Sequence, residues 1–317
     1  MNNKICQKYN RKYIIPTYSA TLAIEGILKS LDLNKQTRVL ISSISCYSIL
    51  EAILNANLTP VIATPKNGII FTKNEIEMIV KKYNINIYIA VDQYGYYQEI
   101  PNINKLIVIN DVSQSWDLSS LDKKKIEYNG DYIVTSLGKS KPLNNGIGGL
   151  IITDVDILSR FDLKTRDDRY KEYPLLEYYY PLRINYRKIV NKANRKVKRQ
   201  RRNAKLFDNI FKRYSFVNVY RNDKFISSYH RYVIDISNEK KSEIIEILNK
   251  SKINYELEHR IKLTHLPITK KLNIQIIDHN QNSNYILIKP NNRLLNIIKL
   301  RKEMKVKYEK ESTNTLY

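Results

Sequence analysis

The sequence predicts an α/β protein, with a large domain built on a mostly parallel, doubly wound sheet and a smaller C-terminal α+β domain. Through residue 153, short apolar runs rich in Ile and Val alternate with helical patterns, which is typical of parallel strands joined by helices. The chain has 317 residues, and 43% of them are hydrophobic, which suffices for a sizeable core. Beyond residue 153 the alternation stops and a long basic helical pattern follows.

Six short runs, most of them β-branched, are the expected strands of the large domain. They lie at 38–43, 59–64, 87–91, 105–110, 131–137 and 148–153. A helical pattern at 22–31 precedes them. Runs this short, separated by helical patterns, favour strands of a buried parallel sheet.

The second half of the chain has a different organisation. Residues 154–182 carry mixed charge and a tyrosine-rich stretch between two prolines, so we expect an irregular connection. Its tyrosines either cover the large domain, which we favour, or line a dimer interface. A long helix is expected to begin near Arg187 and to keep an apolar stripe as far as Tyr214.

Strands and helices of a small α+β domain follow this helix. The strands are expected near 229–236 and 285–289, and the helices near 239–250 and 292–308. The predicted domains are a large domain at 1–182, a basic connecting helix at 183–214 and a small α+β domain at 215–317.

The composition argues against several classes of protein. Cys6 and Cys46 are far apart and lack CxxC spacing, which excludes a disulfide framework and a zinc knuckle and favours a reducing compartment. No apolar run approaches the length of a membrane span, and the first residues lack the apolar core of a signal peptide. We expect a soluble, cytoplasmic protein.

The four histidines do not suggest a metal site. No pair among His230, His259, His265 and His279 has the i, i+4 spacing of a helical metal site. We expect them to be structural or exposed.

The net charge of +23 is concentrated in one segment. Residues 183–213 contain thirteen Lys and Arg against one acidic residue, Asp208. Such a cluster either binds nucleic acid through its phosphates or forms a solvated helix face. We favour the second interpretation, because a regular apolar stripe interrupts the charge and no nucleic-acid-binding motif accompanies it. A positive field would also attract an anionic substrate.

An aspartate and a lysine follow two of the expected strands. Asp111 comes directly after the run at 105–110, and Lys141 follows the run at 131–137. Pyridoxal phosphate (PLP) chemistry needs a lysine that binds the cofactor aldehyde and a carboxylate that keeps the pyridine nitrogen protonated. Ligands of open α/β sheets lie outside the carboxyl ends of the strands, so the two side chains could face one crevice. The pair alone is weak support, because the chain has 54 Lys and Arg.

The surrounding residues strengthen the case, because they resemble the DegT/StrS family of sugar aminotransferases, which have the type I fold of PLP-dependent transferases. The segment Asn110-Asp111-Val112-Ser113-Gln114-Ser115-Trp116 is similar to the family's E-D-A-A-Q-A-H. Ser136, Lys141 and the turn at 146–149 keep the family's spacing around its cofactor lysine. Ser19-Ala20-Thr21, before the first helix, is similar to its S-G-T phosphate cradle. The resemblance covers roughly residues 17–153.

The resemblance implies a set of site residues. Lys141 and Asp111 would be catalytic and would bind the cofactor. Further cofactor contacts would come from Ala20, Thr21, Cys46, Tyr47, Gln114, Ser136 and Asn185. Asn185 stands in an Asn-Tyr-Arg loop similar to one that family members send into the partner subunit's site.

Other interpretations of these residues remain open. Lys141 competes with Lys139, although the family spacing favours Lys141. Asp111 has the position of a helix N-cap. Ser136 and Thr21 would then be a strand-end and a cap hydroxyl, and Gln114 a solvent-exposed side chain.

The sequence also departs from the family pattern. Cys46, next to Tyr47, aligns with the aromatic residue that stacks on the cofactor ring. Asp92 replaces a histidine two residues before Tyr94; it either pairs with Tyr94 in a site or is a surface carboxylate, and we favour the surface carboxylate. Ile147 replaces the glutamate of the glycine turn.

The resemblance implies a PLP-dependent aminotransferase that converts a keto sugar, carried on a nucleotide, to an amino sugar in polysaccharide or glycan biosynthesis. Lys141 would hold the cofactor and move the proton during transamination, and Asp111 would stabilise the pyridinium. The implied partners are an amino-acid donor, a nucleotide-sugar substrate and a second copy of the chain. Two alternatives are a catalytically divergent protein of the same fold and a basic nucleic-acid-binding protein.

Overall fold

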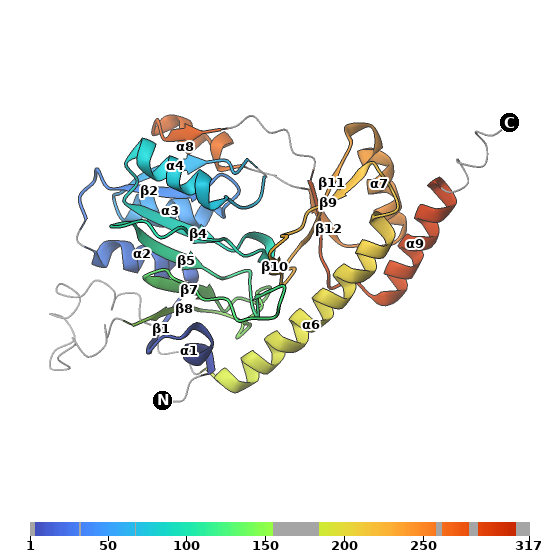
Figure 1. Cartoon of the computed structure of the whole chain (residues 1–317), viewed down its shortest axis with the longest axis horizontal. Helices are drawn as coiled ribbons and strands as arrows, with labels where there is room; N and C mark the ends of the chain where they lie inside the picture. The colour runs from blue at the N-terminus through green and yellow to red at the C-terminus, as the bar shows by residue number, and fades with distance from the viewer. Residues whose placement is uncertain are drawn as a thin grey trace.

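The computed structural model describes residues 4–31, 33–66, 68–154, 184–257, 262–278 and 285–308. An eight-stranded sheet forms the centre of the large domain, in the order β1-β8-β7-β5-β4-β2-β3-β13. The six strands from β7 to β13 are parallel, whereas β8 is antiparallel to both β7 and β1. The mostly parallel α/β sheet predicted from the sequence is therefore confirmed (Figure 1).

All six predicted strands form, with ends within two residues of those expected. They are β2 (Arg38–Ser42), β3 (Thr59–Ala63), β4 (Ile87–Val91), β5 (Ile107–Asp111), β7 (Tyr132–Ser136) and β8 (Gly149–Thr153). Two strands of the sheet were not predicted, β1 (Tyr13–Thr17) and β13 (Gln275–Ile277). Both lie at the edges of the sheet. β1 contains Pro16, which an edge strand tolerates, and β13 has only three residues, too few for a visible pattern.

Helices cover both faces of the large sheet. The helices of this part are α1 (Lys4–Tyr9), α2 (Ala20–Ser30), α3 (Tyr47–Asn55) and α4 (Lys73–Tyr83), with the 3-10 turn η1 (Gln93–Gly95) after β4. Ile27 and Ile53, from α2 and α3, pack with Ile41 and Ile109 in one core cluster. Ile76 of α4 belongs to a second cluster, with the side chains of β2, β3 and β4 that point to the other face. This two-sided burial is the reason why the strands read as continuous apolar runs.

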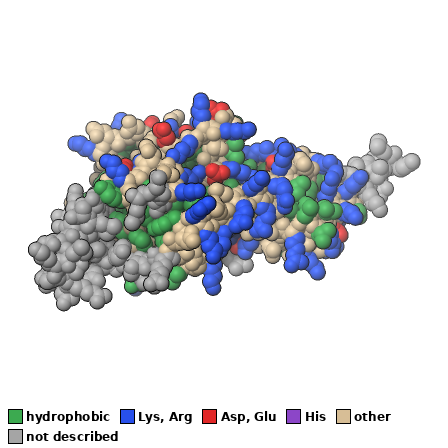
Figure 2. All heavy atoms as spheres, turned by 90° about the horizontal axis from the view of Figure 1, so that it is seen from below, with side chains coloured by type: hydrophobic (Ala, Val, Ile, Leu, Met, Phe, Trp, Pro, Cys, Tyr) green, Lys and Arg blue, Asp and Glu red, His purple; other side chains and the backbone are tan. Residues whose placement is uncertain are grey.

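A long helix, α6 (Tyr186–Phe211), connects the two parts of the molecule, as predicted (Figure 1). Its first half packs Val190 and Val197 against α1 and the end of β7, and its second half packs Phe207 and Phe211 into the core of the small part. Most Lys and Arg side chains of this helix are exposed. Figure 2 shows basic side chains gathered on the face seen there.

A four-stranded sheet forms the small part, in the order β12-β14-β11-β9. Its elements are β9 (Val217–Val219), β11 (Tyr232–Ile236), α7 (Asn238–Lys250), β12 (Tyr255–Leu257), β14 (Tyr285–Ile288) and α9 (Leu294–Tyr308). A two-stranded ribbon, β6 (Ser119–Ser120) with β10 (Phe225–Ile226), links it to the large part. Tyr96, Val233 and Tyr285 share a further buried cluster, so the two parts also pack together.

Residues 262–278 do not join the small sheet, although they lie within the range expected for the small domain. β13 pairs with β3 in parallel, and Leu263 in the 3-10 turn η3 (Leu263–His265) is buried in the core of the large sheet. Ile268 of α8 (Pro267–Lys271) packs against the same core. The chain therefore returns to the large sheet before it completes the small one. The expected boundaries at 182 and 214 stay a prediction, as does the tyrosine-rich connection, most of which lies outside the described residues.

Candidate functional site

A cavity of about 220 Å³ lies at the edge of the large sheet where β4, β5 and β7 end. Residues from several separate segments line it. They are Ser19, Ala20, Thr21, Ile24, Cys46, Ser48, Ile49, Val91, Asp111, Ser113, Gln114, Ser136 and Lys141. Parallel strands bring their carboxyl ends to the same edge, which is why residues so distant in sequence meet here.

Lys141 reaches the cavity from a tight turn after β7. Its backbone N–H donates to the carbonyl of Gly138 at 3.0 Å, and the Gly138 N–H donates to Ser136 Oγ at 3.3 Å. Lys141 is half-buried, whereas Lys139 is exposed and does not line the cavity. The geometry therefore favours Lys141 over Lys139.

Asp111 is the last residue of β5 and is buried. Its Oδ1 accepts the Ser113 N–H at 2.9 Å, so its side chain caps the turn that follows the strand. Ser113 Oγ is buried and has no hydrogen-bond partner in the described part of the chain. Gln114, which also lines the cavity, accepts the Tyr94 N–H through Oε1 at 3.1 Å.

The N-terminus of α2 forms another wall of the cavity. Ser19 is the N-cap, and its Oγ accepts the Leu22 N–H at 3.1 Å. Ala20 and Thr21 begin the helix beside it. Gly149 of β8 lets this end of the helix approach the sheet, because a Cβ there would lie 2.4 Å from the Ser19 carbonyl carbon. A helix N-terminus with a hydroxyl beside it is a favourable site for a phosphate.

Two residues that the sequence assigned to the site are not in this cavity. Tyr47 is 48% exposed, whereas its neighbours Cys46 and Ser48 line the cavity. Asn185 is the N-cap of α6, and its Oδ1 accepts the Lys188 N–H at 2.9 Å. Asn185 is expected to act in the site of a partner subunit, so its role stays a prediction.

Some residues that line the cavity are not predicted from the sequence. Ser48 and Ser113 have no predicted role in the site, whereas Ser19 belongs to the segment predicted to bind the phosphate. The sequence contains a sign that Ser113 belongs to the site, because Ser113 follows Asp111 by two residues in the segment that resembles the family.

The expectation that Asp92 is a surface carboxylate is wrong. Asp92 directly follows β4 and is 1% exposed. Its Oδ2 accepts hydrogen bonds from the Ser115 hydroxyl at 2.6 Å and the Tyr128 hydroxyl at 2.7 Å. Its Oδ1 accepts a hydrogen bond from the Gln98 N–H at 2.9 Å. Burial, with a smaller contribution from the charge of Asp111, raises the pKa of Asp92 to about 7.

Two of the four histidines lie in the described residues. His265 is exposed. His230 is buried, and desolvation together with nearby cations lowers its pKa well below the usual value. His259 and His279 lie outside the described residues. No group of three or more possible metal ligands occurs in the described part.

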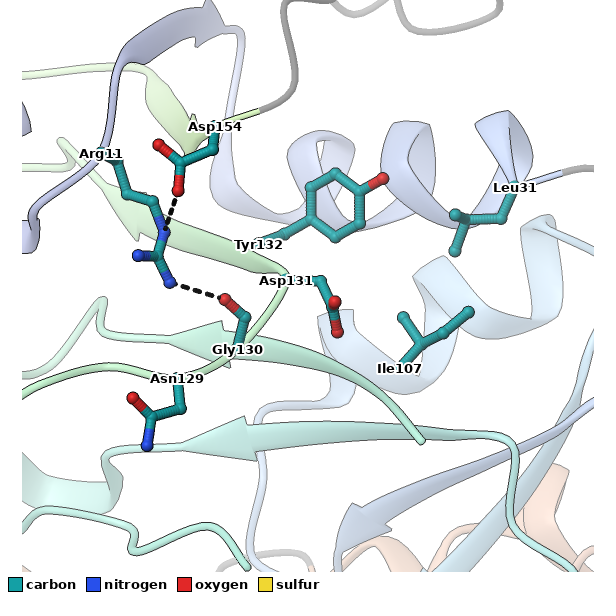
Figure 3. A pocket seen from close by; sticks show the side chains of 8 residues that line it. All are labelled: Arg11, Leu31, Ile107, Asn129, Gly130, Asp131, Tyr132 and Asp154. Carbon is teal, nitrogen blue, oxygen red and sulfur yellow. Dashed lines mark hydrogen bonds and ion pairs between the residues drawn. The ribbon is translucent and has the colours of Figure 1, made fainter. Parts of the chain in front are cut away.

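A second, more open hollow of about 470 Å³ lies at the opposite end of the strands (Figure 3). Its charged groups are already paired, since Arg11 Nε lies 3.6 Å from Asp154 and Arg11 Nη2 donates to the Gly130 carbonyl at 2.9 Å. Asp131 Oδ2 accepts the Val108 N–H at 2.8 Å. The charged groups around this hollow therefore serve the fold, and we do not assign it as a ligand site.

The lining of the first cavity suits PLP. The cofactor needs an amine for its aldehyde, a carboxylate for its ring nitrogen and an anion site for its phosphate. Lys141, Asp111 and the start of α2 provide one of each. The unpartnered Ser113 Oγ leaves a hydrogen-bonding group for a ligand.

The fold and this lining define the class of PLP-dependent transferases of fold type I. The model of the DegT/DnrJ/EryC1/StrS aminotransferase family matches residues 1–165. The chain belongs to this family and is a PLP-dependent aminotransferase. The family resemblance seen in the sequence is confirmed.

Solved structures share this fold at low sequence identity. One is a DegT DnrJ EryC1 StrS aminotransferase from Brucella abortus (15% identity, TM-score 0.73, 96% of this chain and 88% of that chain covered). Another is Helicobacter pylori PseC, an aminotransferase of pseudoaminic acid biosynthesis (16% identity, TM-score 0.72, 96% of this chain and 89% of that chain covered). A third is the E. coli GDP-4-keto-6-deoxy-D-mannose-3-dehydratase with bound hydrated PLP (15% identity, TM-score 0.72, 95% of this chain and 90% of that chain covered).

No curated protein sequence matches the chain. Within the residues that the structure describes, none of the helices has the length and apolar character needed to cross a bilayer.

Proposed function

We propose that this aminotransferase transfers the amino group of an amino-acid donor to a keto sugar carried on a nucleotide, in polysaccharide or glycan biosynthesis, with Lys141 and Asp111 as its catalytic residues. One observation carries the proposal: Lys141 and Asp111, from different strands, line the same cavity as the N-terminus of α2. The family membership and the sugar-related names of PseC and the E. coli dehydratase support the choice of substrate class.

Each residue has a defined task in this proposal. PLP, when bound, supplies a covalent link for the amino group and a ring that accepts the electrons released when a substrate proton leaves. The backbone N–H groups at the start of α2 and the Thr21 hydroxyl would bind its phosphate. Asp111 would keep the ring nitrogen protonated, and its Oδ2 is the oxygen that the Ser113 N–H leaves free for this task. Gln114 and Ser136 line the cavity beside it.

Lys141 has two tasks. Its amine would hold the cofactor aldehyde between turnovers, and the free Lys141 Nζ would take up and return the proton that the substrate carbon exchanges. Both tasks require the amine to return to the same place in the cavity. The tight turn after β7 is closed by the hydrogen bond from the Lys141 N–H to the Gly138 carbonyl, and it restricts the position of the Lys141 Cα.

We also propose a homodimer with composite sites, in which Asn185 of one subunit completes the site of the other. Tyr18 and Tyr47 support this, because both are nearly half exposed and stand next to lining residues, Ser19 and Cys46. Tyrosine is enriched in protein–protein interfaces relative to the rest of the surface. We place the enzyme in the cytoplasm, which agrees with the free thiols of Cys6 and Cys46.

The first test is the absorbance spectrum of the purified protein with added PLP. The wild type should show a band near the visible edge that borohydride removes, and mass spectrometry should then locate the added mass at Lys141. Lys141→Ala should lack the band, whereas Lys139→Ala should keep it, because Lys139 is exposed outside the cavity. A band that persists in Lys141→Ala would contradict the assignment.

The reaction type needs a separate measurement. Incubation of the loaded protein with amino acids should convert the bound cofactor to its amine form, and the amine form should then aminate a nucleotide-linked keto sugar. A sugar product that loses a hydroxyl without gaining nitrogen would instead indicate dehydration.

A further inference from the structure

The long basic helix α6 contains one lysine that differs from most of its neighbours. Lys188, Lys192, Lys198 and Lys205 are exposed on this helix. Lys196 is half-buried, and its Nζ donates hydrogen bonds to the carbonyls of Ser140 at 2.7 Å and Lys141 at 2.9 Å. A residue of the connecting helix therefore contacts the backbone of the residue that reaches the cavity.

The surrounding contacts show why this position matters. Leu137 and Leu143, at the two ends of the lysine turn, are fully buried in the same cluster as Val197 of α6. Between them Pro142 is also buried, whereas Lys139 and Ser140 are exposed, so apolar packing holds the ends of the turn but not residues 139 and 140. The ammonium of Lys196 holds this part of the turn through two charge-assisted hydrogen bonds.

We propose that Lys196 is a positioning residue of the cofactor site: by binding the carbonyls of Ser140 and Lys141, it fixes the backbone from which the Lys141 side chain enters the cavity. The two carbonyls belong to the consecutive peptide groups Ser140–Lys141 and Lys141–Pro142, which flank the Lys141 Cα, so their orientation sets the direction of the Lys141 Cα–Cβ bond. A reacting group must be held closely for efficient chemistry. This inference rests on the role proposed above for Lys141.

The electrostatic surroundings of Lys196 support a specific role. Partial burial, followed by the charges of Arg231, Arg199 and Lys141, lowers the pKa of Lys196 to about 8. A cation held where its charged form is disfavoured is more frequent at functional sites than on a solvated helix face. At least one of the basic residues of α6, Lys196, therefore has a defined contact, with the turn that carries Lys141.

The test compares Lys196→Met, Lys196→Arg and the matched control Lys192→Met, which removes an exposed charge one turn earlier on the same helix. Hydrogen exchange of the backbone amides at 139–145 is measured first, without cofactor. We expect about tenfold faster exchange in Lys196→Met than in the control, since hydrogen bonds from a charged donor are lost. Lys196→Arg should restore most of the protection, because a guanidinium can also donate to two carbonyls.

PLP is the probe in the second measurement. At saturating PLP, and below the unfolding temperature of every variant, borohydride should trap a several-fold smaller fraction of the bound PLP at Lys141 in Lys196→Met than in Lys192→Met. Equal exchange and equal trapping in these two variants would overturn the proposal, as would a loss that Lys196→Arg does not restore. A wild type that shows no Lys141-dependent band would instead refute the proposed function, and the exchange data would still decide whether Lys196 holds the turn.

Discussion

Two aspartates at the same edge of the sheet have different surroundings. Asp111 ends β5 and lines the cavity, whereas Asp92 follows β4, donates its N–H to the Asp111 carbonyl and is enclosed by Ser115, Tyr128 and Gln98. Because burial raises the pKa of Asp92 to about 7, this carboxyl is largely neutral in slightly acidic solution. In such solution the neighbouring Asp92 therefore adds little negative charge next to Asp111.

Asp111→Asn should bind PLP but lose most of its activity. The amide has the same shape but cannot hold a proton on the ring nitrogen, so we expect the rate to fall by roughly 10²-fold or more. Steady-state rates, together with a PLP titration, measure the effect. Asp122→Asn, in an exposed turn away from the cavity, is the control, and equal rates for the two variants would refute the role of Asp111.

Asp92→Asn should change how stability depends on pH. The folded-state pKa of Asp92 is about 7, above the unfolded value near 4, so the folded state binds this proton more tightly. The stabilisation is therefore present in acid and is lost as the pH rises towards 7. Relative to the variant, the wild type should lose roughly 3 kcal/mol of unfolding free energy between pH 5 and pH 8. Denaturant titrations at both pH values measure it, and parallel pH profiles would contradict the assignment.

At the scale of elements, the site depends on how closely α2 approaches β8. The N-terminus of α2 is an anion site only if its first N–H groups face the cavity, and Gly149 permits this approach because it has no Cβ. The sequence shows a glycine at the start of a strand, but the closeness of the helix is visible only in the folded chain.

Gly149→Ala should weaken both the fold and the binding of PLP. The added Cβ would lie 2.4 Å from Ser19 C and 2.6 Å from Ala20 N, both backbone atoms that can move only if the helix shifts. We expect a loss of about 1–3 kcal/mol in stability and weaker PLP binding. Thermal unfolding and PLP titration measure the two effects. In Gly138→Ala the nearest atom is 3.4 Å away, so this variant should change stability little; equal losses in both would argue against the close approach.

At the scale of the molecule, α6 joins two cores and carries much of the net charge of +23. Its basic side chains are mostly on the surface, on the face shown in Figure 2. A field of one sign attracts ligands of the opposite sign, and salt screens it. PLP and nucleotide-linked sugars are both anions, so the charge of the molecule favours their approach.

The rate of PLP association with the cofactor-free protein should therefore fall as salt is added. We expect a decrease of roughly threefold or more between 10 mM and 300 mM ionic strength. Stopped-flow measurements at both salt concentrations test this. Reversal of two exposed charges, Lys192→Glu with Lys198→Glu, should slow association at low salt only. A rate that does not depend on salt would show that the charge of α6 serves another purpose.

The sequence by itself determined the class of fold, the family and the six central strands. It could do so because buried parallel strands leave continuous apolar runs and because Asp111 and Lys141 stand in motifs with fixed spacing. These are local signals, which each segment carries without its neighbours.

Only the tertiary structure decided which residues meet. It buried Asp92, which the sequence placed on the surface, brought β13 from residue 275 to the edge of the large sheet, and set Lys196 against the turn of Lys141. None of these outcomes follows from a local pattern, because burial and hydrogen-bond partners depend on segments that are distant in the chain. Packing of the whole molecule, rather than any single motif, therefore gives these side chains their environments.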